Sequence, residues 1–193
     1  MGKGEETRRL IVGRALERTR EVGLEGVTLG TLAEDLHLSK SGLFAHFKSK
    51  EALQREVLDA AAAQFVVDVV RPALGEPRGE ARVRALVDRY LAWIAENSGG
   101  CVFMALSHEY DDRPGPIRDR LVATQREWLS TLARAAQIAI DEGHFRPDLD
   151  PEQFAYEFLG LGMAFHHANR LIADPIAETR ARTAFATLIE RSR

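Results

Sequence analysis

Apolar residues recur at helical spacing along almost the whole chain of 193 residues. A first amphipathic segment, which carries Ile11 and Leu16, precedes eight more, bounded by glycine, proline or short polar residues. These further segments span about residues 28–36, 39–47, 50–74, 80–96, 101–109, 117–142, 151–173 and 176–190. The clearest start signal among them is Asp150, an N-cap acid, followed by Pro151. The pattern predicts an all-α protein of about nine helices, with an N-terminal domain over 1–50 and a helical body over 51–193.

Two short helices joined by a tight turn are predicted between residues 27 and 50. Thr28 and Ser39 are good N-caps, one for each helix. The first helix has one apolar face, made of Leu29, Leu32, Ala33 and Leu36. The residues expected to point from the second helix toward the same core are Leu43, Phe44 and Phe47. Together with the amphipathic segment before them, they predict a three-helix, helix-turn-helix domain, a module that places one helix in the major groove of DNA.

The outward face of the second short helix carries small residues and one cation. It consists of Lys40, Ser41, Gly42 and Ala45. Such a face can approach base edges closely, whereas bulkier side chains would hold the helix away from the groove. Lys48 and Lys50 follow on either side of Ser49, at the start of the next helix, where backbone N–H groups and the helix dipole favour phosphate.

Residues 5–58 resemble the N-terminal domain of the TetR family of transcriptional regulators. The resemblance is carried by the link GLEGVT (23–28) and by the strings LSKSGLFAHFK (38–48) and SKEAL (49–53). Phe44 stands where the family usually has a tyrosine, whose hydroxyl commonly reaches a DNA phosphate. Phe44 is therefore expected to keep the packing and to lose that hydrogen bond.

The resemblance implies a DNA-contacting set and a partner. Thr28, His46, Lys48 and Lys50 take positions that contact phosphates, and Lys40 and Ser41 take positions that read bases. The whole set is Thr28, Ser39, Lys40, Ser41, Gly42, Phe44, His46, Lys48 and Lys50. The implied partner is a palindromic operator in double-stranded DNA, bound by a homodimer.

Charge is unevenly distributed along the chain, whose net charge is −3. Residues 1–50 hold nine Lys/Arg against seven Asp/Glu, including all four lysines, and the rest of the chain is acidic. A DNA-contacting end on an acidic body has this distribution, because phosphate attraction is local in salt. The single cysteine, and the lack of a signal peptide or of an apolar run long enough to span a membrane, predict a cytoplasmic protein with no membrane partner.

The resemblance also implies that the body binds a small hydrophobic effector between its helices. The expected lining is aromatic, with sulfur and a few polar groups. It comprises Trp93, Cys101, Phe103, Met104, His108, Tyr110, Trp128, Phe158, Met163, Phe165 and His166. An alternative is that these aromatic residues simply form the core.

The last two helices carry much apolar surface for terminal elements, which indicates dimerisation through them, the family's usual arrangement. The expected dimer residues are Phe154, Phe158, Leu161, Phe165, Phe185 and Leu188. Gly160 and Gly162 inside a helix predict a close approach of another helix. The alternative, that the same residues close the core of one chain, remains open.

Catalysis and metal binding find little support. Six candidate ligands, His108, Asp111, Asp112, His144, His166 and His167, lack metal-site spacing, so no metal and no cofactor are expected. No nucleophile elbow or phosphate loop occurs, so we do not expect an enzyme. The sequence favours a repressor released from its operator by a small hydrophobic ligand. The alternatives are an activator, a regulator without a ligand, and a small-molecule or metal-sensing helical protein that does not act through DNA.

Overall fold

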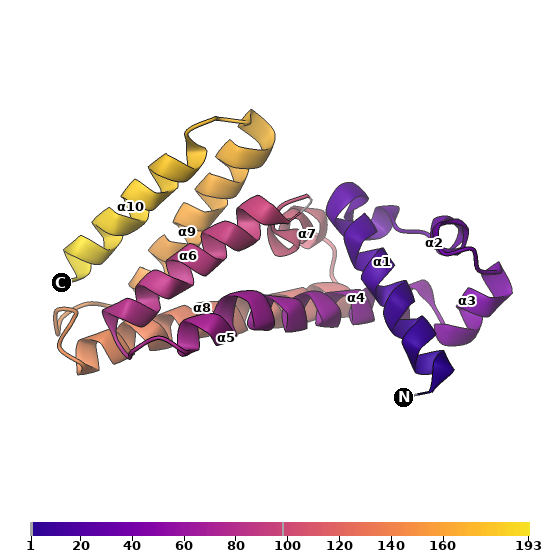
Figure 1. Cartoon of the computed structure of the whole chain (residues 1–193), viewed down its shortest axis with the longest axis horizontal. Coiled ribbons are helices and arrows are strands. Elements are labelled where there is room, and N and C mark those ends of the chain that lie inside the picture. The colour runs from indigo at the N-terminus through magenta and orange to yellow at the C-terminus, as the bar shows by residue number, and fades with distance from the viewer. Residues whose placement is uncertain (1, 98) are drawn as a thin grey trace. The chain divides into compact units, whose positions relative to one another are not determined.

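The structure, a computed structural model, describes residues 2–97 and 99–193, without the side chains of Lys3 and Lys40. Ser98, in the predicted break after residue 96, therefore lies outside it. All regular structure in the described part is helical (Figure 1). In chain order the elements are α1 (Lys3–Gly26), α2 (Leu29–Asp35), α3 (Lys40–His46), α4 (Lys50–Phe65), η1 (Val66–Val70), α5 (Arg71–Leu74), α6 (Glu80–Glu96), α7 (Val102–Tyr110), α8 (Pro116–Asp141), α9 (Pro151–His167), η2 (Ala168–Ile172) and α10 (Ala177–Ser192).

The predicted all-α architecture is confirmed. The segment predicted over 50–74 is built by α4, the π-helical turn η1 and α5 in succession, and the segment predicted over 151–173 is built by α9 and η2. Contacts divide the chain into two compact units, Met1–Gln64 with Val102–Val122, and Phe65–Cys101 with Ala123–Arg193. The N-terminal unit thus extends beyond residue 50, where the sequence analysis places the boundary, and it includes α7.

The helix starts read from the sequence are built as capping theory requires. Thr28 Oγ1 accepts a hydrogen bond from Thr31 N at 3.1 Å, and Ser39 Oγ accepts one from Gly42 N at 3.0 Å. Asp150 Oδ1 accepts from the backbone N–H groups of Glu152 and Gln153 at 2.9 and 3.1 Å. Each cap satisfies backbone donors that the first turn of a helix leaves unpaired.

The second unit is built around a cluster of aromatic rings from the end of α4 and from α6, α8, α9 and α10. Phe65, at the end of α4, packs edge-on against Trp128, with ring centroids 4.8 Å apart. Tyr90 lies 5.3 Å from Trp128 and 5.9 Å from Phe158, and Phe158 lies 4.7 Å from Phe185. Aromatic pairs at these separations add about 0.5–1.5 kcal/mol each to the free energy of burial. The cluster therefore joins helices that are distant in the sequence.

Gly162 allows α9 to approach this cluster closely. A Cβ atom added at Gly162 would lie 2.3 Å from Cε1 of the buried Tyr90 ring, whereas a Cβ at Gly160 would meet nothing within 4 Å. The close approach predicted from the two glycines is thus made by Gly162 within this unit. Gly160 faces outward on the same helix.

We expect Gly162→Ala to lower the free energy of unfolding by about 1–3 kcal/mol, because the new methyl group overlaps the Tyr90 ring. In a Tyr90→Leu background the overlap is gone, so the same change should be neutral or should stabilise the helix by up to about 1 kcal/mol. Urea unfolding of the four proteins of this cycle measures both values. Equal costs in the two backgrounds would show that the ring does not exclude a side chain at this position.

Candidate nucleic-acid interface

The turn between α2 and α3 is fixed by backbone hydrogen bonds. Leu38 N donates to Ala33 O at 2.9 Å and His37 N donates to Glu34 O at 3.2 Å, the two bonds of a Schellman motif. His37 occupies the left-handed position of that motif, with φ of 54°. The chain therefore leaves α2 and enters α3 at a defined angle, although no glycine marks the turn.

The recognition helix α3 is anchored on one face only. Leu43 and Phe47 are fully buried, as is Leu32 of α2, whereas Ser41, Gly42 and Ala45 are exposed as predicted. The expectation that Phe44 points to the core is wrong, because its side chain is 53% exposed. Leu43 and Phe47, four residues apart, already fill the narrow inner face of so short a helix. Phe44 thus lies with the outward residues, and the side chain of Lys40 lies outside the described part.

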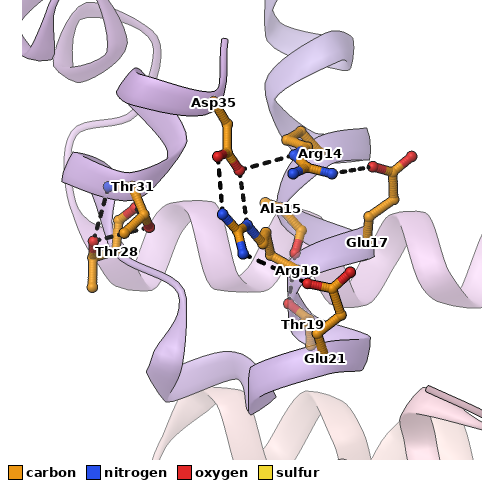
Figure 2. A network of polar contacts seen from close by, with 9 residues as sticks. All are labelled: Arg14, Ala15, Glu17, Arg18, Thr19, Glu21, Thr28, Thr31 and Asp35. Carbon is orange, nitrogen blue, oxygen red and sulfur yellow. Dashed lines mark hydrogen bonds and ion pairs between the residues drawn. The ribbon is translucent and has the colours of Figure 1, made fainter. Parts of the chain in front are cut away.

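An ion-pair network that the sequence analysis missed holds α2 against α1 (Figure 2). The Asp35 carboxylate accepts from Arg18 Nε and Nη2 at 2.8 and 2.9 Å and from Arg14 Nε at 2.9 Å. Hydrogen bonds from Arg18 and then Arg14 lower the pKa of Asp35 to about 2, so it is ionised at neutral pH. The available signal was the spacing of Arg14 and Arg18, which places two cations on one flank of α1.

Arg8 joins α1 to the end of α3 and to α4. Its guanidinium donates to the backbone carbonyl of His46 and forms an ion pair with Glu56, with Nε 2.8 Å from Oε2. The guanidinium carbon also lies 4.6 Å from the centre of the Phe47 ring, a cation–π contact. Arg8 therefore fixes the C-terminal end of α3, and its charge is already engaged within the protein.

Lys50 is engaged within the protein in the same way. Its Nζ donates to Glu25 Oε2 at 2.8 Å and to the Glu25 backbone carbonyl at 2.9 Å. The same carboxylate accepts from Tyr110 Oη at 2.8 Å and from Gln54 Nε2 at 3.0 Å. Hydrogen bonds from Lys50, Tyr110 and Gln54 lower the pKa of Glu25 to about 2. Lys50 thus ties α4 to the end of α1, so its predicted role as a phosphate contact is not supported by this arrangement.

Lys48 differs from Lys50 although the two lie only two residues apart. Its side chain is exposed, and it makes no hydrogen bond or ion pair with any residue in the described part of the chain. It precedes the start of α4, where Ser49 Oγ caps Ala52 N at 3.1 Å. Of the two lysines, Lys48 is the one that leaves its charge available to a phosphate.

Helix α7 belongs to the same unit and contacts the end of α1. Glu109 accepts from the backbone N–H groups of Leu24 and Glu25 at 2.9 and 2.7 Å. Gly23 permits this contact: its φ is 76°, and a Cβ atom there would lie 2.8 Å from Glu109 Oε2. Because the Tyr110 hydroxyl donates to Glu25, Tyr110 belongs to this junction and its assignment to an effector pocket is not supported.

Two family comparisons match the two regions of the chain. Residues 11–57 match "Bacterial regulatory proteins, tetR family", and residues 79–185 match "Tetracyclin repressor-like, C-terminal domain". The chain belongs to the TetR family. The first match contains the helix-turn-helix described above, so this part of the chain is the family's DNA-binding region.

Individual relatives of this TetR-family chain are distant. The uncharacterized HTH-type transcriptional regulator YobS of Bacillus subtilis (strain 168) is 25% identical over 116 residues, and the match spans 60% of each chain. A TetR transcriptional regulator from Chloroflexus aurantiacus J-10-FL has 26% identity and a TM-score of 0.88, with 98% of this chain and 96% of that chain covered. AibR in complex with isovaleryl coenzyme A and operator DNA shares the fold, with a TM-score of 0.76, 22% identity, and coverage of 94% and 97%.

The residues predicted to line an effector pocket are mostly buried. Those that are buried are Trp93, Cys101, Phe103, Met104, Tyr110, Trp128, Phe158 and Phe165. His166 is half-buried, whereas His108 and Met163 are exposed. Within the second unit, Trp93 and Trp128 both pack on Phe65, at 5.3 and 4.8 Å between ring centroids. The members come from both units, so their grouping in one pocket stays a prediction.

The residues chosen for the dimer seam do not form an exposed surface. Phe154, Phe158, Phe165, Phe185 and Leu188 are buried inside the second unit, and Leu161 is half-buried. The five buried side chains therefore cannot supply the surface of a seam, so their assignment is wrong, whereas that of Leu161 stays a prediction. They close the core of a single chain, which is the alternative reading of the same apolar pattern.

The described residues contain neither a cluster of metal ligands nor a helix suited to cross a membrane. Among them, no three His, Cys, Asp or Glu side chains gather as ligands of one metal ion would. No helix there combines the length and apolar character needed to cross a membrane. Cys101 is buried and forms no disulfide.

We expect Lys48→Ala to weaken binding to any duplex and to reduce the salt dependence of log K by about one, because one phosphate contact is lost. Lys50→Ala should instead lower the free energy of unfolding by up to about 1 kcal/mol, because it removes a half-exposed partner of Glu25. Fluorescence anisotropy on a mixed-sequence duplex and urea unfolding separate the two effects. If Lys50→Ala lowers the salt dependence as much as Lys48→Ala, the Glu25 pair opens on DNA.

Proposed function

We propose that this TetR-family protein is a cytoplasmic repressor that binds a palindromic operator as a homodimer and is released by a small hydrophobic ligand. The observation that carries the proposal is the outward face of α3. Three exposed, small or aromatic side chains, Ser41, Ala45 and Phe44, flank Gly42 on a helix whose opposite face is fully buried. Among the side chains that the structure describes on this face, none is both bulky and charged, so none would hold the helix away from the base edges.

The charges beside α3 support contact with the DNA backbone. Lys48 at its end is exposed and unengaged, while Arg8 and Lys50 hold the helix in place from within. Phosphate contacts of this kind fix the position of a recognition helix, and base contacts from its outward face then give specificity. In a two-fold dimer, two such helices would read half-sites about 34 Å apart.

The proposed effector would act through the second unit. A solved structure with the same fold holds both isovaleryl coenzyme A and operator DNA, which supports a body that binds small molecules in this architecture. Such a ligand can release DNA only if it binds more tightly to the conformation in which the two recognition helices fit the operator poorly. Catalysis has no part in this mechanism.

The outward face of α9 supports the homodimer. Three apolar side chains on α9 and η2 are strongly exposed: Tyr156 at 72%, Met163 at 44% and Leu171 at 76%. Helical spacing places Tyr156 and Met163 on the same side of α9 as Gly160 and Ala164, which are also exposed. In Figure 1, α10 runs back beside α9, so the two form a helical hairpin. We therefore place the seam on this face rather than on the buried phenylalanines.

The DNA-binding part is tested by a negative charge on the recognition face. Ala45→Glu should lower affinity for an operator selected from random duplexes by about a hundredfold or more, because the carboxylate faces the bases and phosphates. Ala63→Glu, on an exposed position of α4, is the matched control and should retain affinity within about threefold. If selection enriches no sequence, or if both variants bind like the wild type, α3 is not the reading helix.

The dimer is tested by the same substitution on α9. Ala164→Glu should yield monomers in analytical ultracentrifugation, because the seam would bury a charge without a partner. Ala81→Glu, in the first turn of α6 where a carboxylate is favoured, is the matched control and should remain dimeric. A folded Ala164→Glu dimer would place the seam elsewhere.

A further inference from the structure

The second unit contains a cavity between α5, α6 and α8 that is separate from the aromatic cluster. We call it the arginine cavity. Its volume is about 300 Å³, and its lining is Val70, Leu74, Arg82, Leu86, Ser130, Thr131, Arg134, Ala135 and Ile138. Three helical stripes form it: residues 70 and 74, residues 82 and 86, and residues 130–138 at helical spacing. Its volume lies at the lower end of the range for ligand sites, so it suits a small ligand.

The floor of the arginine cavity is apolar and its edge is open. Leu86, Ala135 and Ile138 are buried, whereas Leu74 at the rim is 52% exposed. Exposed leucine beside an apolar floor leaves an incompletely covered hydrophobic surface, which favours an aliphatic or aromatic group of a ligand.

The polar lining of the arginine cavity has only one sign of charge. It holds two arginines and two hydroxyls, and no carboxylate is among the lining residues. Arg134 is exposed and makes no ion pair or hydrogen bond with the described residues. Ser130 is likewise exposed, so its hydroxyl is free to donate. Unbalanced cations beside an apolar floor are complementary to an anionic head on an apolar tail.

Arg82 is already held in place for such a head group. Its Nη2 donates to the backbone carbonyls of Leu74 and Glu76 at 3.2 and 3.0 Å. Its Nε is buried and has no hydrogen-bond partner in the described part of the chain. A buried charged donor without an acceptor is costly, and a carboxylate bound at the same guanidinium would offset its charge through a charge-assisted bond. Nη2 thus fixes the end of α5, whereas Nη1 makes no hydrogen bond with the described residues and is not fully buried, so it is the atom that faces a ligand.

We propose that the arginine cavity binds a small carboxylate with an apolar tail, with the carboxylate between Arg82 and Arg134 and the tail over Leu86 and Ile138. This site lies outside the aromatic cluster and shares no residue with the expected effector lining. The inference does not depend on the proposed repressor function, because it concerns binding to the chain without DNA. A neutral or cationic amphiphile would fill the same floor but leave both arginines unpaired.

The test uses octanoate as the probe, with octanol and octylammonium of equal chain length as comparisons. Calorimetric titration of the full-length protein should show octanoate binding about tenfold more tightly than octanol, and no binding of octylammonium. Arg134→Gln should weaken octanoate about tenfold without unfolding the chain, because Arg134 has no structural partner. Arg126→Gln, an exposed arginine of the same helix outside the cavity, is the matched control and should bind octanoate like the wild type.

Arg82→Gln should also weaken octanoate, but it removes the cap of α5, so Arg134→Gln decides. Octanol binding as tightly as octanoate would overturn the role of the arginines. Octanoate binding that Arg134→Gln and Arg126→Gln leave equally unchanged would place the ligand elsewhere, and no octanoate binding at all would overturn the site. Operator binding, measured separately on the same variants, is expected to be unchanged in the absence of octanoate, so failure here is distinguishable from failure of the DNA-binding proposal.

Discussion

A recognition helix of seven residues cannot hold its own shape in water, and this constraint governs the N-terminal unit. Isolated helices shorter than about 12–15 residues are marginal, because nucleation costs more than so few hydrogen bonds return. The surroundings of α3 supply the difference: Ser39 caps its start, Leu43 and Phe47 bury its inner face, and Arg8 binds the carbonyl of His46 at its end. Because the protein stabilises α3 from behind and from both ends, its outer face is left free of structural duties.

Charged side chains near the helix-turn-helix also serve mainly to stabilise the fold. Most of the cations near the helix-turn-helix form ion pairs within the protein. Arg14 and Arg18 pair with Asp35, Arg8 pairs with Glu56, and Lys50 pairs with Glu25. The low pKa values of Asp35 and Glu25, both about 2, follow from these contacts and keep the acceptors ionised at neutral pH. A count of lysines and arginines therefore overstates the charge that this unit offers to phosphate. Lys48 matters because the protein has not already neutralised it.

Sequence reasoning succeeded where the cause is local and failed where a partner decides. The side chains of Thr28, Ser39 and Asp150 accept hydrogen bonds from backbone N–H groups only two or three residues further along the chain. The helix starts were therefore predictable from the local sequence. In a helix of only two turns, the spacing of apolar residues is compatible with more than one inward face, so the sequence places Phe44 in the core. The burial of Leu43 and Phe47 shows which face is inward. The pairing of Lys50 with Glu25 spans 25 residues, and that of Tyr110 with Glu25 spans 85, so neither has a local signature.

Helix α9 has two faces that carry apolar side chains, and the seam predicted from the sequence lies on the wrong one. The inner face carries Phe158 and Phe165 and comes close enough to Tyr90 to require Gly162. The outer face, with Tyr156 and Met163, is exposed in a single chain. Apolar side chains that gather on an exposed face are typical of a surface that binds another protein. The chain's own core already covers the phenylalanines of the inner face, whereas the exposed Tyr156 and Met163 belong to the face on which we propose the seam.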